Sequence, residues 1–495
     1  MPAPDLLRYV HPNGPIIEEH DWVDPEAAFA PHAESDGALW LDSSDTAHHT
    51  ARYSFIALAP YQVHQGAQGD AAAQLEAIAA ELRAHAALWD TLPDDIDALV
   101  PPFRGGAAGY FGYDMAPSTG PSESADAHSP QTLPALCIGF YDGVIAFDHH
   151  AKRCFLIATG LPETTPARRA DRANKKLAAW RQMLVGLPAK PLPNPVPAPP
   201  LAAALQSNFT AQAYEDGVQK VIDHILAGDI FQANLAQRFH ARLNPADSSF
   251  AYYQRLRRMS PAPFSGYHYF KGWAMASASP ERFLQAQNAV VETRPIKGTE
   301  ARGATPAQDS EIAARLMASE KDRAENIMIV DLLRNDLAKT CRDGSIRVPQ
   351  LCALESFANV HHLVSTVRGQ LADDKTPLEA LQASFPGGSI TGAPKRRAME
   401  VIDAIEPDHR GPSYGSIGYI GYDACMDTNI IIRTAFMRGD EINFHVGGGI
   451  VADSQPRREY QETLNKARGL MDALGVDFAS AMADQRQQKK QEKVS

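Results

Sequence analysis

The sequence contains little cysteine, and the spacing of its cysteines matches neither a disulfide framework nor a metal site. Five occur among 495 residues, an odd count, and no two of them make a CxxC pair. Widely spaced single cysteines argue against both a disulfide framework and a structural zinc site. We therefore expect reduced, packed side chains at all five positions: Cys137, Cys154, Cys341, Cys352 and Cys425.

Long apolar runs and an excess of positive charge are also absent. No stretch of about 18 apolar residues is present, so a membrane protein is excluded. Residues 1–19 lack a basic flank followed by an apolar stretch, which argues against a signal peptide and favours a cytoplasmic location. The formal net charge is −12, so nucleic acid is not an expected partner. An anionic substrate would need a local pocket.

Prolines divide the chain. Seven of them fall between residues 187 and 200, which favours an extended backbone without hydrogen bonds. We interpret 187–208 as a Pro-rich linker between an N-terminal region at 1–186 and a catalytic region at 209–475. A polar tail follows at 476–495.

The hydrophobic pattern predicts helices and strands without a strand-helix repeat, which indicates an α+β protein. Predicted helices cover 71–85, a segment capped by Thr210 and ending near Gly228, a stretch at 311–336 with a break, and 394–405. Predicted strands cover 38–41, 138–147, 231–239, 415–422, 429–436 and 441–446.

Acidic residues at helical spacing form the first candidate site. Glu459, Glu462 and Lys466 would project from one helical face, and Glu325 lies on another predicted helix. Carboxylates together with substrate oxygens and water suit Mg²⁺. The alternative is a solvated salt-bridging face.

Three further motifs hold candidate residues. Lys297 lies in RPIKGT, between a proline and a glycine, and is either a nucleophile or a surface turn lysine. The glycine-rich turns at 386–395 and 447–449 match neither a P-loop nor a dinucleotide fingerprint, so each is an anion contact or a plain turn. His361 and His362 alternate as in a strand, which would aim only one of them at a given site.

Taken together and in order, these motifs resemble the chorismate-utilising enzymes, which include anthranilate, aminodeoxychorismate, isochorismate and salicylate synthases. The resemblance covers about 209–474. It rests on SPERF (279–283), RPIKGT (294–299), DRAENIMIVDLLRND (322–336), HHLVST (361–366), PGGSITGAPK (386–395), MDTNIIIRT (426–434) and GGGIVADS (447–454). It implies two packed antiparallel β-sheets with outer helices, to which the N-terminal segment also contributes.

Within the family, anthranilate synthases usually carry alanine where this chain has Lys297. The stretches GDIFQANLAQRF (228–239) and EYQET (459–463) look most like the aminodeoxychorismate-forming branch, component I. Anthranilate synthase, isochorismate synthase and a catalytically dead tryptophan-binding protein are the alternatives.

The resemblance implies roles for individual residues. Lys297 would attack the chorismate ring, Glu281 would protonate the leaving hydroxyl, and His362 would orient it. Glu325, Glu459 and Glu462 would hold Mg²⁺. Substrate contacts are expected from Gly298, Thr299, Tyr419, Arg433, Gly447, Gly448 and Lys466.

The resemblance also implies partners. No glutamine amidotransferase is visible in the chain, so ammonia is expected from a separate amidotransferase subunit in a heterodimer. A tryptophan pocket is expected where two segments meet, at Ser43 and at Pro263, Phe264 and Ser265.

Overall fold

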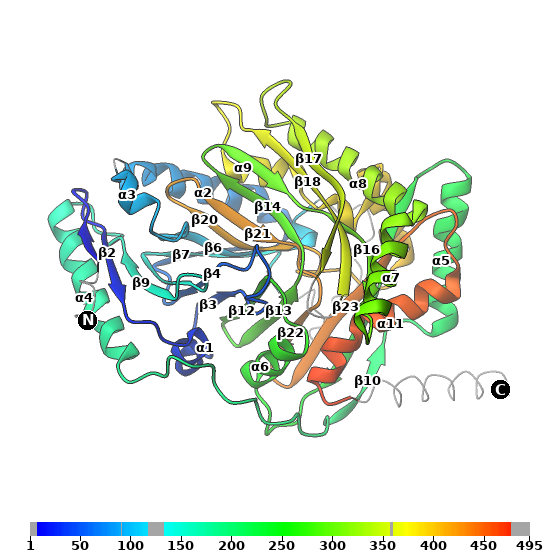
Figure 1. The fold of residues 1–495 in the computed structure, drawn as a ribbon, viewed down its shortest axis with the longest axis horizontal. Helices are drawn as coiled ribbons and strands as arrows, with labels where there is room; N and C mark the ends of the chain where they lie inside the picture. Colours follow the sequence, from blue (N-terminus) through cyan, green and yellow to red (C-terminus); the bar gives the residue numbers. More distant parts are fainter. Residues whose placement is uncertain (1–6, 91, 117–132, 357–359, 477–495) are drawn as a thin grey trace.

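Two large antiparallel β-sheets with helices on their outer sides make up the protein (Figure 1). The computed structural model describes residues 7–90, 92–116, 133–356 and 360–476. The fold class expected from the sequence is confirmed. Apart from Val476, the predicted polar tail lies outside the described residues.

The first sheet has 13 strands in the order β1-β2-β9-β8-β4-β3-β12-β13-β22-β23-β11-β10, with β19 paired to β11. Its strands are β1 (Arg8–Val10), β2 (Ile16–His20), β3 (Ala38–Asp42), β4 (Tyr53–Ala57), β8 (Gly143–Asp148), β9 (Arg153–Ala158), β10 (Ala203–Ser207), β11 (Gln232–Arg242), β12 (Phe264–Phe270), β13 (Trp273–Ser279), β19 (Gly392–Ala393), β22 (Thr434–Arg438) and β23 (Glu441–Ile450).

The second sheet has 10 strands in the order β16-β18-β15-β14-β21-β20-β6-β7-β5, with β17 paired to β18. Its strands are β5 (Gln62–Gly66), β6 (Gly106–Phe111), β7 (Leu136–Tyr141), β14 (Arg282–Gln287), β15 (Val290–Thr293), β16 (Ile296–Ala301), β17 (Arg347–Ser356), β18 (Val360–Gln370), β20 (Ser416–Gly421) and β21 (Met426–Asn429).

Both sheets are shared between the two halves of the chain. β3 pairs with β12 in the first sheet, and β6 pairs with β20 in the second. Strand hydrogen bonds therefore run between the regions on either side of the predicted linker at 187–208. The predicted end of that linker at residue 208 is wrong, because residues 203–207 form the edge strand β10. Beyond Pro200 the backbone again has N–H groups that can pair.

The helices begin where the sequence supplies a cap. Thr210 accepts a hydrogen bond from the backbone N–H of Ala213 at 3.1 Å. The helix predicted at 311–336 is two helices, because the Ser319 side chain caps the second one. The helices are α1 (Pro25–Phe29), α2 (Ala71–Ala84), α3 (Asp94–Asp97), α4 (Pro166–Leu184), α5 (Ala211–Leu226), α6 (Ser249–Met259), α7 (Pro306–Ala318), α8 (Glu320–Ala338), α9 (Pro377–Ser384), α10 (Lys395–Ile405) and α11 (Pro456–Ala473).

Three predictions about strands were wrong in their bounds. The segment at 138–147 belongs to two strands, β7 and β8. The segment at 429–436 is interrupted between β21, which ends at Asn429, and β22, which begins at Thr434; Arg433, directly before β22, has a φ of +49°. The glycines at 447–449 lie inside β23 and pair with β11, so they are not a turn.

The first sheet is buried on both faces, because alternate residues of its strands enter two different hydrophobic clusters. Along β13, Trp273 and Met275 enter one hydrophobic cluster, which also holds Ile417 of the second sheet. Ala274 and Ala276 enter a second cluster, which the outer helices α4, α5, α6, α10 and α11 complete. Alternate side chains thus pack towards the other sheet and towards the helices.

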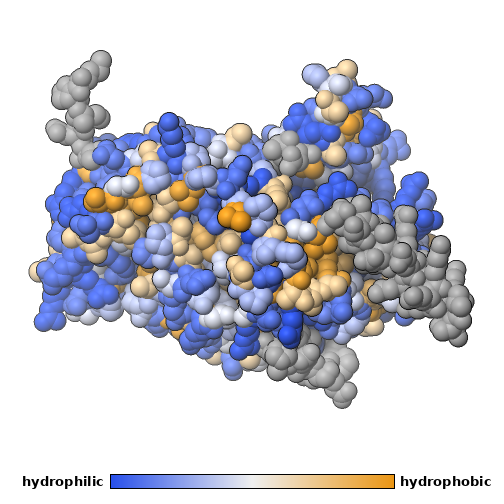
Figure 2. Space-filling model, turned by 90° about the horizontal axis from the view of Figure 1, so that it is seen from below, coloured by the Kyte–Doolittle hydropathy of each residue, from blue (hydrophilic) through white to orange (hydrophobic). Residues whose placement is uncertain are grey.

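The face of the molecule shown in Figure 2 is largely hydrophilic, with apolar residues in small patches. All five cysteines are free, as predicted, and all but the half-buried Cys425 are buried. Within the described ranges, no helix is long and apolar enough to cross a membrane.

A buried ion-pair network fastens the N-terminal segment to α6. Arg257 Nε lies 2.8 Å from Asp42 Oδ2, and Arg257 Nη1 lies 2.7 Å from Glu26 Oε2. Both carboxylates are buried. A charged group removed from water in this way destabilises the fold unless an oppositely charged partner compensates for its lost hydration.

Arg257→Met is expected to lower the free energy of unfolding by about 3 kcal/mol, because two buried carboxylates lose a partner. Urea unfolding measures this. Arg334→Met is the control, since Arg334 is exposed and pairs with Asp331 on the surface, where a pair contributes less than about 1 kcal/mol. An equally small loss in both variants would contradict a stabilising role for the buried network.

Candidate active site

Lys297 lies on β16 in a buried, acidic setting. Its Nζ is 2.8 Å from Glu325 Oε1 on α8 and donates to the main-chain oxygen of Ser389 at 3.3 Å. The same Glu325 oxygen accepts a hydrogen bond from Gln232 Nε2 at 2.8 Å. Only 9% of Lys297 is exposed. The predicted nucleophile therefore contacts a predicted metal ligand.

A bulge in β16 sets the direction of these side chains. The pairing with β18 shifts between Lys297 and Thr299, and Gly298 between them has a φ of +81°. A Cβ on Gly298 would also lie 3.1 Å from Asp322 Cβ. Glycine is needed here because its backbone occupies the left-handed region and packs against α8.

Glu281 precedes β14 and is almost fully buried. Burial raises the pKa of its carboxyl to about 7, against the opposing effects of a hydrogen bond from Ser389 and the nearby Lys297 charge. A carboxyl with a pKa near neutrality can hold and release a proton at neutral pH. The setting suits the proton donor predicted from the sequence.

His362 is a buried residue of β18. Its Nδ1 is 2.8 Å from Thr299 Oγ1. Burial lowers the pKa of its imidazole to about 3, and the Arg433 charge adds to this, so the ring is neutral at neutral pH. His361 instead contacts Ser356 and Asp309. As expected for a strand, the two histidines meet different partners.

The glycines of β23 lie beneath the acidic groups of α11. A Cβ on Gly448 would lie 3.5 Å from Glu459 Oε2, 3.6 Å from Glu462 Oε1 and 3.6 Å from Lys466 Nζ. Lys466 Nζ also donates to the Gly447 oxygen at 2.9 Å and pairs with Glu462 at 2.8 Å. The helix face predicted from the sequence is therefore aimed at the glycine strand.

The next glycine extends this contact to α8. A Cβ on Gly449 would lie 2.7 Å from Glu325 Oε1 and 2.2 Å from Gln232 Nε2. Figure 1 shows β16, β23, α7, α8 and α11 gathered on one side of the molecule, and contacts join β23 to α11 and β16 to both α7 and α8. Consecutive glycines of one strand thus contact Glu325 of α8 and the two glutamates of α11, although Cβ directions alternate along a strand and the ligand oxygens of the three glutamates do not all lie within 4.8 Å of one another.

The three glutamates offer the oxygen donors that Mg²⁺ prefers. Burial raises the pKa of Glu459, whereas the Lys466 charge lowers the pKa of the half-exposed Glu462. Their oxygens do not form a closed cage. Mg²⁺ commonly takes one or two carboxylates and completes its shell with substrate and water, so the open arrangement fits this ion.

Within the described ranges, one group of three His, Cys, Asp or Glu ligand atoms lies within 4.8 Å of one another: His48, His49 and Glu355. Arg294 forms an ion pair with Glu355 and adds a positive charge beside both imidazoles. The charge of Arg294 opposes a bound cation, so this group is better described as a hydrogen-bonded ion-pair network.

Arg433 supplies a cation close to Glu281. Burial lowers the pKa of its guanidinium, and the Glu281 charge opposes that effect. Among the described residues its guanidinium makes no hydrogen bond or ion pair. A half-buried, planar donor of this kind suits a substrate carboxylate.

A cavity of about 1040 Å³ is lined by the residues predicted to form a tryptophan pocket. It is called the second cavity below, to distinguish it from the site around Lys297. Ser43 Oγ donates to the main-chain oxygens of Tyr53 at 2.7 Å and of Pro263 at 3.2 Å, and Phe264 and Ser265 also line the cavity.

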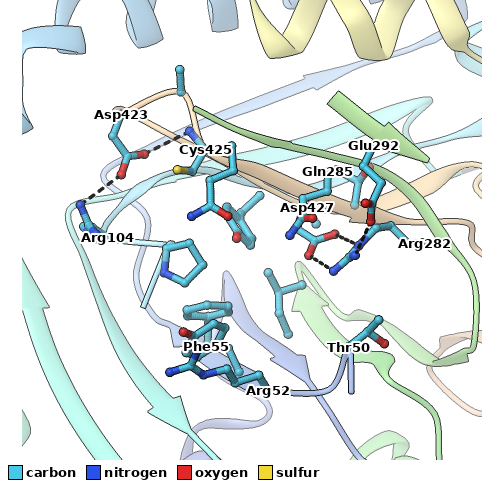
Figure 3. Close-up of a pocket in the computed structure, with 18 of the residues that line it drawn as sticks. Thr50, Arg52, Phe55, Arg104, Arg282, Gln285, Glu292, Asp423, Cys425 and Asp427 are labelled. Carbon is cyan, nitrogen blue, oxygen red and sulfur yellow. Dashed lines mark hydrogen bonds and ion pairs between the residues drawn. The ribbon is translucent and has the colours of Figure 1, made fainter. Parts of the chain in front are cut away.

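Ion pairs line the walls of this cavity, as Figure 3 shows. Arg282 pairs with Asp427 and Glu292, and Arg104 pairs with Asp423. The cavity is therefore strongly polar on these sides.

Tyr419 lies apart from the other predicted substrate contacts. The sequence places it among the substrate contacts, but its ring stacks on Phe103 at 4.5 Å and lines the second cavity together with Ser43. The strand β20 carries it to the same wall as the predicted tryptophan pocket. Tyr414, close to it in the sequence, has its ring beneath the guanidinium of Arg410.

Two residues in contact with the site received no role from the sequence, although their motifs were recognised. Gln232 lies in GDIFQANLAQRF and holds Glu325. Ser389 lies in PGGSITGAPK and contacts both Glu281 and Lys297. A polar residue near the start of a predicted strand was the available signal for Gln232.

Comparison with known proteins gives the family. The chorismate binding enzyme family matches residues 36–472. Aminodeoxychorismate synthase component 1 of Escherichia coli (strain K12) is 42% identical over 373 residues, which are 75% of this chain and 78% of that protein. Anthranilate synthase component 1 of Thermus thermophilus is 39% identical over 77% of this chain and 79% of its own.

Among solved structures, anthranilate synthase component I from Streptococcus pneumoniae superimposes with a TM-score of 0.69 at 28% identity. The match covers 85% of this chain and 92% of the other. Because the family match spans most of the sequence and both sheets, this chain belongs to the chorismate binding enzymes.

Proposed function

We propose that this chain is a component 1 of aminodeoxychorismate synthase, which converts chorismate and ammonia to 4-amino-4-deoxychorismate and water. The observation that carries the proposal is the buried contact of Lys297 with Glu325, beside the protonatable Glu281. The 42% identity to the Escherichia coli protein supports the same branch of the family.

In the proposed reaction the amine of Lys297 first gives up a proton to solvent and then attacks ring carbon 2 of chorismate. Both ring double bonds shift, and the carbon–oxygen bond at carbon 4 breaks. Hydroxide is a poor leaving group, so Glu281 gives it a proton and water departs. Ammonia then bonds to carbon 4, the double bonds shift back, and the bond to Lys297 breaks. The proton that ammonia loses returns to Glu281.

Charge complementarity would hold the substrate dianion. Arg433 would pair with the enolpyruvyl carboxylate, and Lys466 adds positive charge. Glu325, Glu459 and Glu462 would hold Mg²⁺, which supplies charge to offset the ring carboxylate.

The surrounding backbone and polar groups complete the proposed substrate contacts. Gly298, Gly447 and Gly448 are the proposed backbone contacts, because glycine has no side chain of its own to keep a ligand from its main chain. His362, held by Thr299, is neutral and can orient the hydroxyl of carbon 4.

Ammonia is proposed to come from a separate glutamine amidotransferase subunit. The name component 1, carried by the relatives, supports a second subunit. Tryptophan is the proposed ligand of the second cavity, on the strength of the residues gathered at Ser43 and Phe264.

Anthranilate synthase component 1 is the second candidate, because relatives with that name are nearly as similar as those of the first. It would release pyruvate and a fluorescent aromatic acid. Lys297 in place of the alanine usual in that branch favours amination at carbon 4. Isochorismate formation would require Lys297 to activate water instead.

Incubation of the purified chain with chorismate, Mg²⁺ and ammonium is expected to give 4-amino-4-deoxychorismate by mass spectrometry. Lys297→Ala is expected to remove this product because no amine remains to attack the ring. Lys175→Ala, at an exposed lysine of α4, is the control and should retain full activity. Anthranilate as the product, or an active Lys297→Ala variant, would contradict the proposal.

Glu325→Gln is expected to weaken metal binding by at least the roughly 10–100-fold that loss of an outer-shell partner costs. Mn²⁺ binding measured by electron paramagnetic resonance reports this without turnover. Glu320→Gln, at an exposed glutamate of the same helix, is the matched control. Unchanged Mn²⁺ affinity in Glu325→Gln would remove this residue from the metal site.

The pH dependence follows from Glu281. Because the acid must be protonated and its pKa is raised to about 7, the rate is expected to fall as pH rises through about 7. The concentration of free ammonia must be held constant across the series. Glu281→Gln should lose about 10²- to 10⁴-fold in rate and lose this pH limb. If the fall in rate above about pH 7 persists in Glu281→Gln, a group other than Glu281 causes it.

A further inference from the structure

We propose that Thr434 is a positioning residue that holds the backbone of Arg433 in the conformation from which this arginine binds the substrate. The proposal rests on the proposed function, in which Arg433 pairs with a carboxylate of chorismate. It is carried by the hydrogen bonds that surround Arg433 where the chain crosses from the second sheet to the first.

Two neighbouring segments cross between the sheets at this point. β13 of the first sheet leads into β14 of the second, and β21 of the second leads back into β22 of the first. The strands pair on both sides of the crossing, β13 with β22 and β14 with β21. Glu281 lies in the first crossing segment and Arg433 in the second. The fold therefore brings the segments of the proposed acid and of the proposed carboxylate-binding residue side by side.

Hydrogen bonds join the two crossing segments. The N–H of Ile430 donates to the main-chain oxygen of Glu281 at 3.0 Å, and Ser279 Oγ donates to the Ile430 oxygen at 2.6 Å. At the other end, the N–H of Ala278 donates to the Arg433 oxygen at 3.1 Å. These contacts fix where the second segment lies relative to the first.

The backbone of Arg433 needs further support. Its φ of +49° lies in the left-handed region, which costs energy for any residue with a Cβ. The hydroxyl of the next residue offsets this cost, because Thr434 Oγ1 donates to the Ile432 oxygen at 2.9 Å and so bridges the residues on either side of Arg433. Only 3% of Thr434 is exposed, so little water competes for this bond. Without the bridge, the backbone would leave the left-handed region and turn the guanidinium away from the substrate.

Thr434→Val removes the hydroxyl and keeps nearly the same shape. It should weaken chorismate binding roughly three- to tenfold, because the binding conformation becomes less populated by about the factor that one hydrogen bond contributes. Calorimetry with Mg²⁺ and without ammonium, in a Lys297→Ala background where no adduct forms, measures this affinity without turnover. Thr434→Ser keeps the hydroxyl and should bind chorismate as tightly as the parent. Unchanged affinity in Thr434→Val would overturn the proposal.

Ser277→Ala is the matched control. Ser277 of β13 pairs with Thr434 across the sheet, and its Oγ lies 2.8 Å from Thr434 Oγ1. The variant removes a buried contact of the same hydroxyl but leaves the bridge to Ile432, so it should lower the melting temperature without changing the affinity for chorismate. Equal losses of affinity in Thr434→Val and Ser277→Ala would mean that Thr434 acts only through the stability of the strand pair, which would also overturn the proposal.

A double-mutant cycle shows whether Thr434 acts through Arg433. In an Arg433→Ala background no guanidinium remains to be positioned, so Thr434→Val should cause no further loss of chorismate affinity. An undiminished loss in that background would overturn the role of Thr434 whatever the product. The expected pattern of affinities in a chain that forms anthranilate in place of 4-amino-4-deoxychorismate would refute the proposed function alone.

Discussion

The site depends on the packing of three glutamates and a lysine against Gly448 and Gly449 of β23, which have no side chains. At Gly448 and Gly449 the acidic groups of α8 and α11 come within contact distance of the positions where a Cβ would stand. Alanine at Gly449 would displace Gln232 and Glu325. Because like charges gathered here repel one another, Lys297 and Lys466 offset them, and a dianionic substrate would require still more positive charge.

The fold brings these groups together from distant parts of the chain. β16 and β18 of the second sheet carry Lys297 and His362, β23 of the first sheet carries the glycines, and two helices supply the carboxylates. The site therefore lies between the edge strand β16 of the second sheet, the inner strand β23 of the first sheet and the helices that cover them. The N-terminal segment contributes to both sheets, but the predicted tryptophan pocket that it builds with β12 is a separate cavity.

Much of the site could be predicted from the sequence, because the spacing and type of neighbouring residues determine it. Helical spacing placed Glu459, Glu462 and Lys466 on one face, and the α5 cap at Thr210 was readable from residue types alone. The place of two features in the fold could not be predicted, because it depends on long-range contacts. The glycines of β23 look like a turn, but they are required by helices that pack over the strand. Tyr419 was assigned to the substrate because sequence order does not show which face of β20 lines the second cavity.

The most direct test of the account is the position of a divalent ion and of the substrate in crystals. Anomalous scattering from Mn²⁺ in crystals soaked with chorismate should give a peak bordered by Glu325, Glu459 and Glu462, with the ring within reach of Lys297 Nζ. A peak at His48, His49 and Glu355 instead, or a ring bound in the second cavity alone, would contradict it.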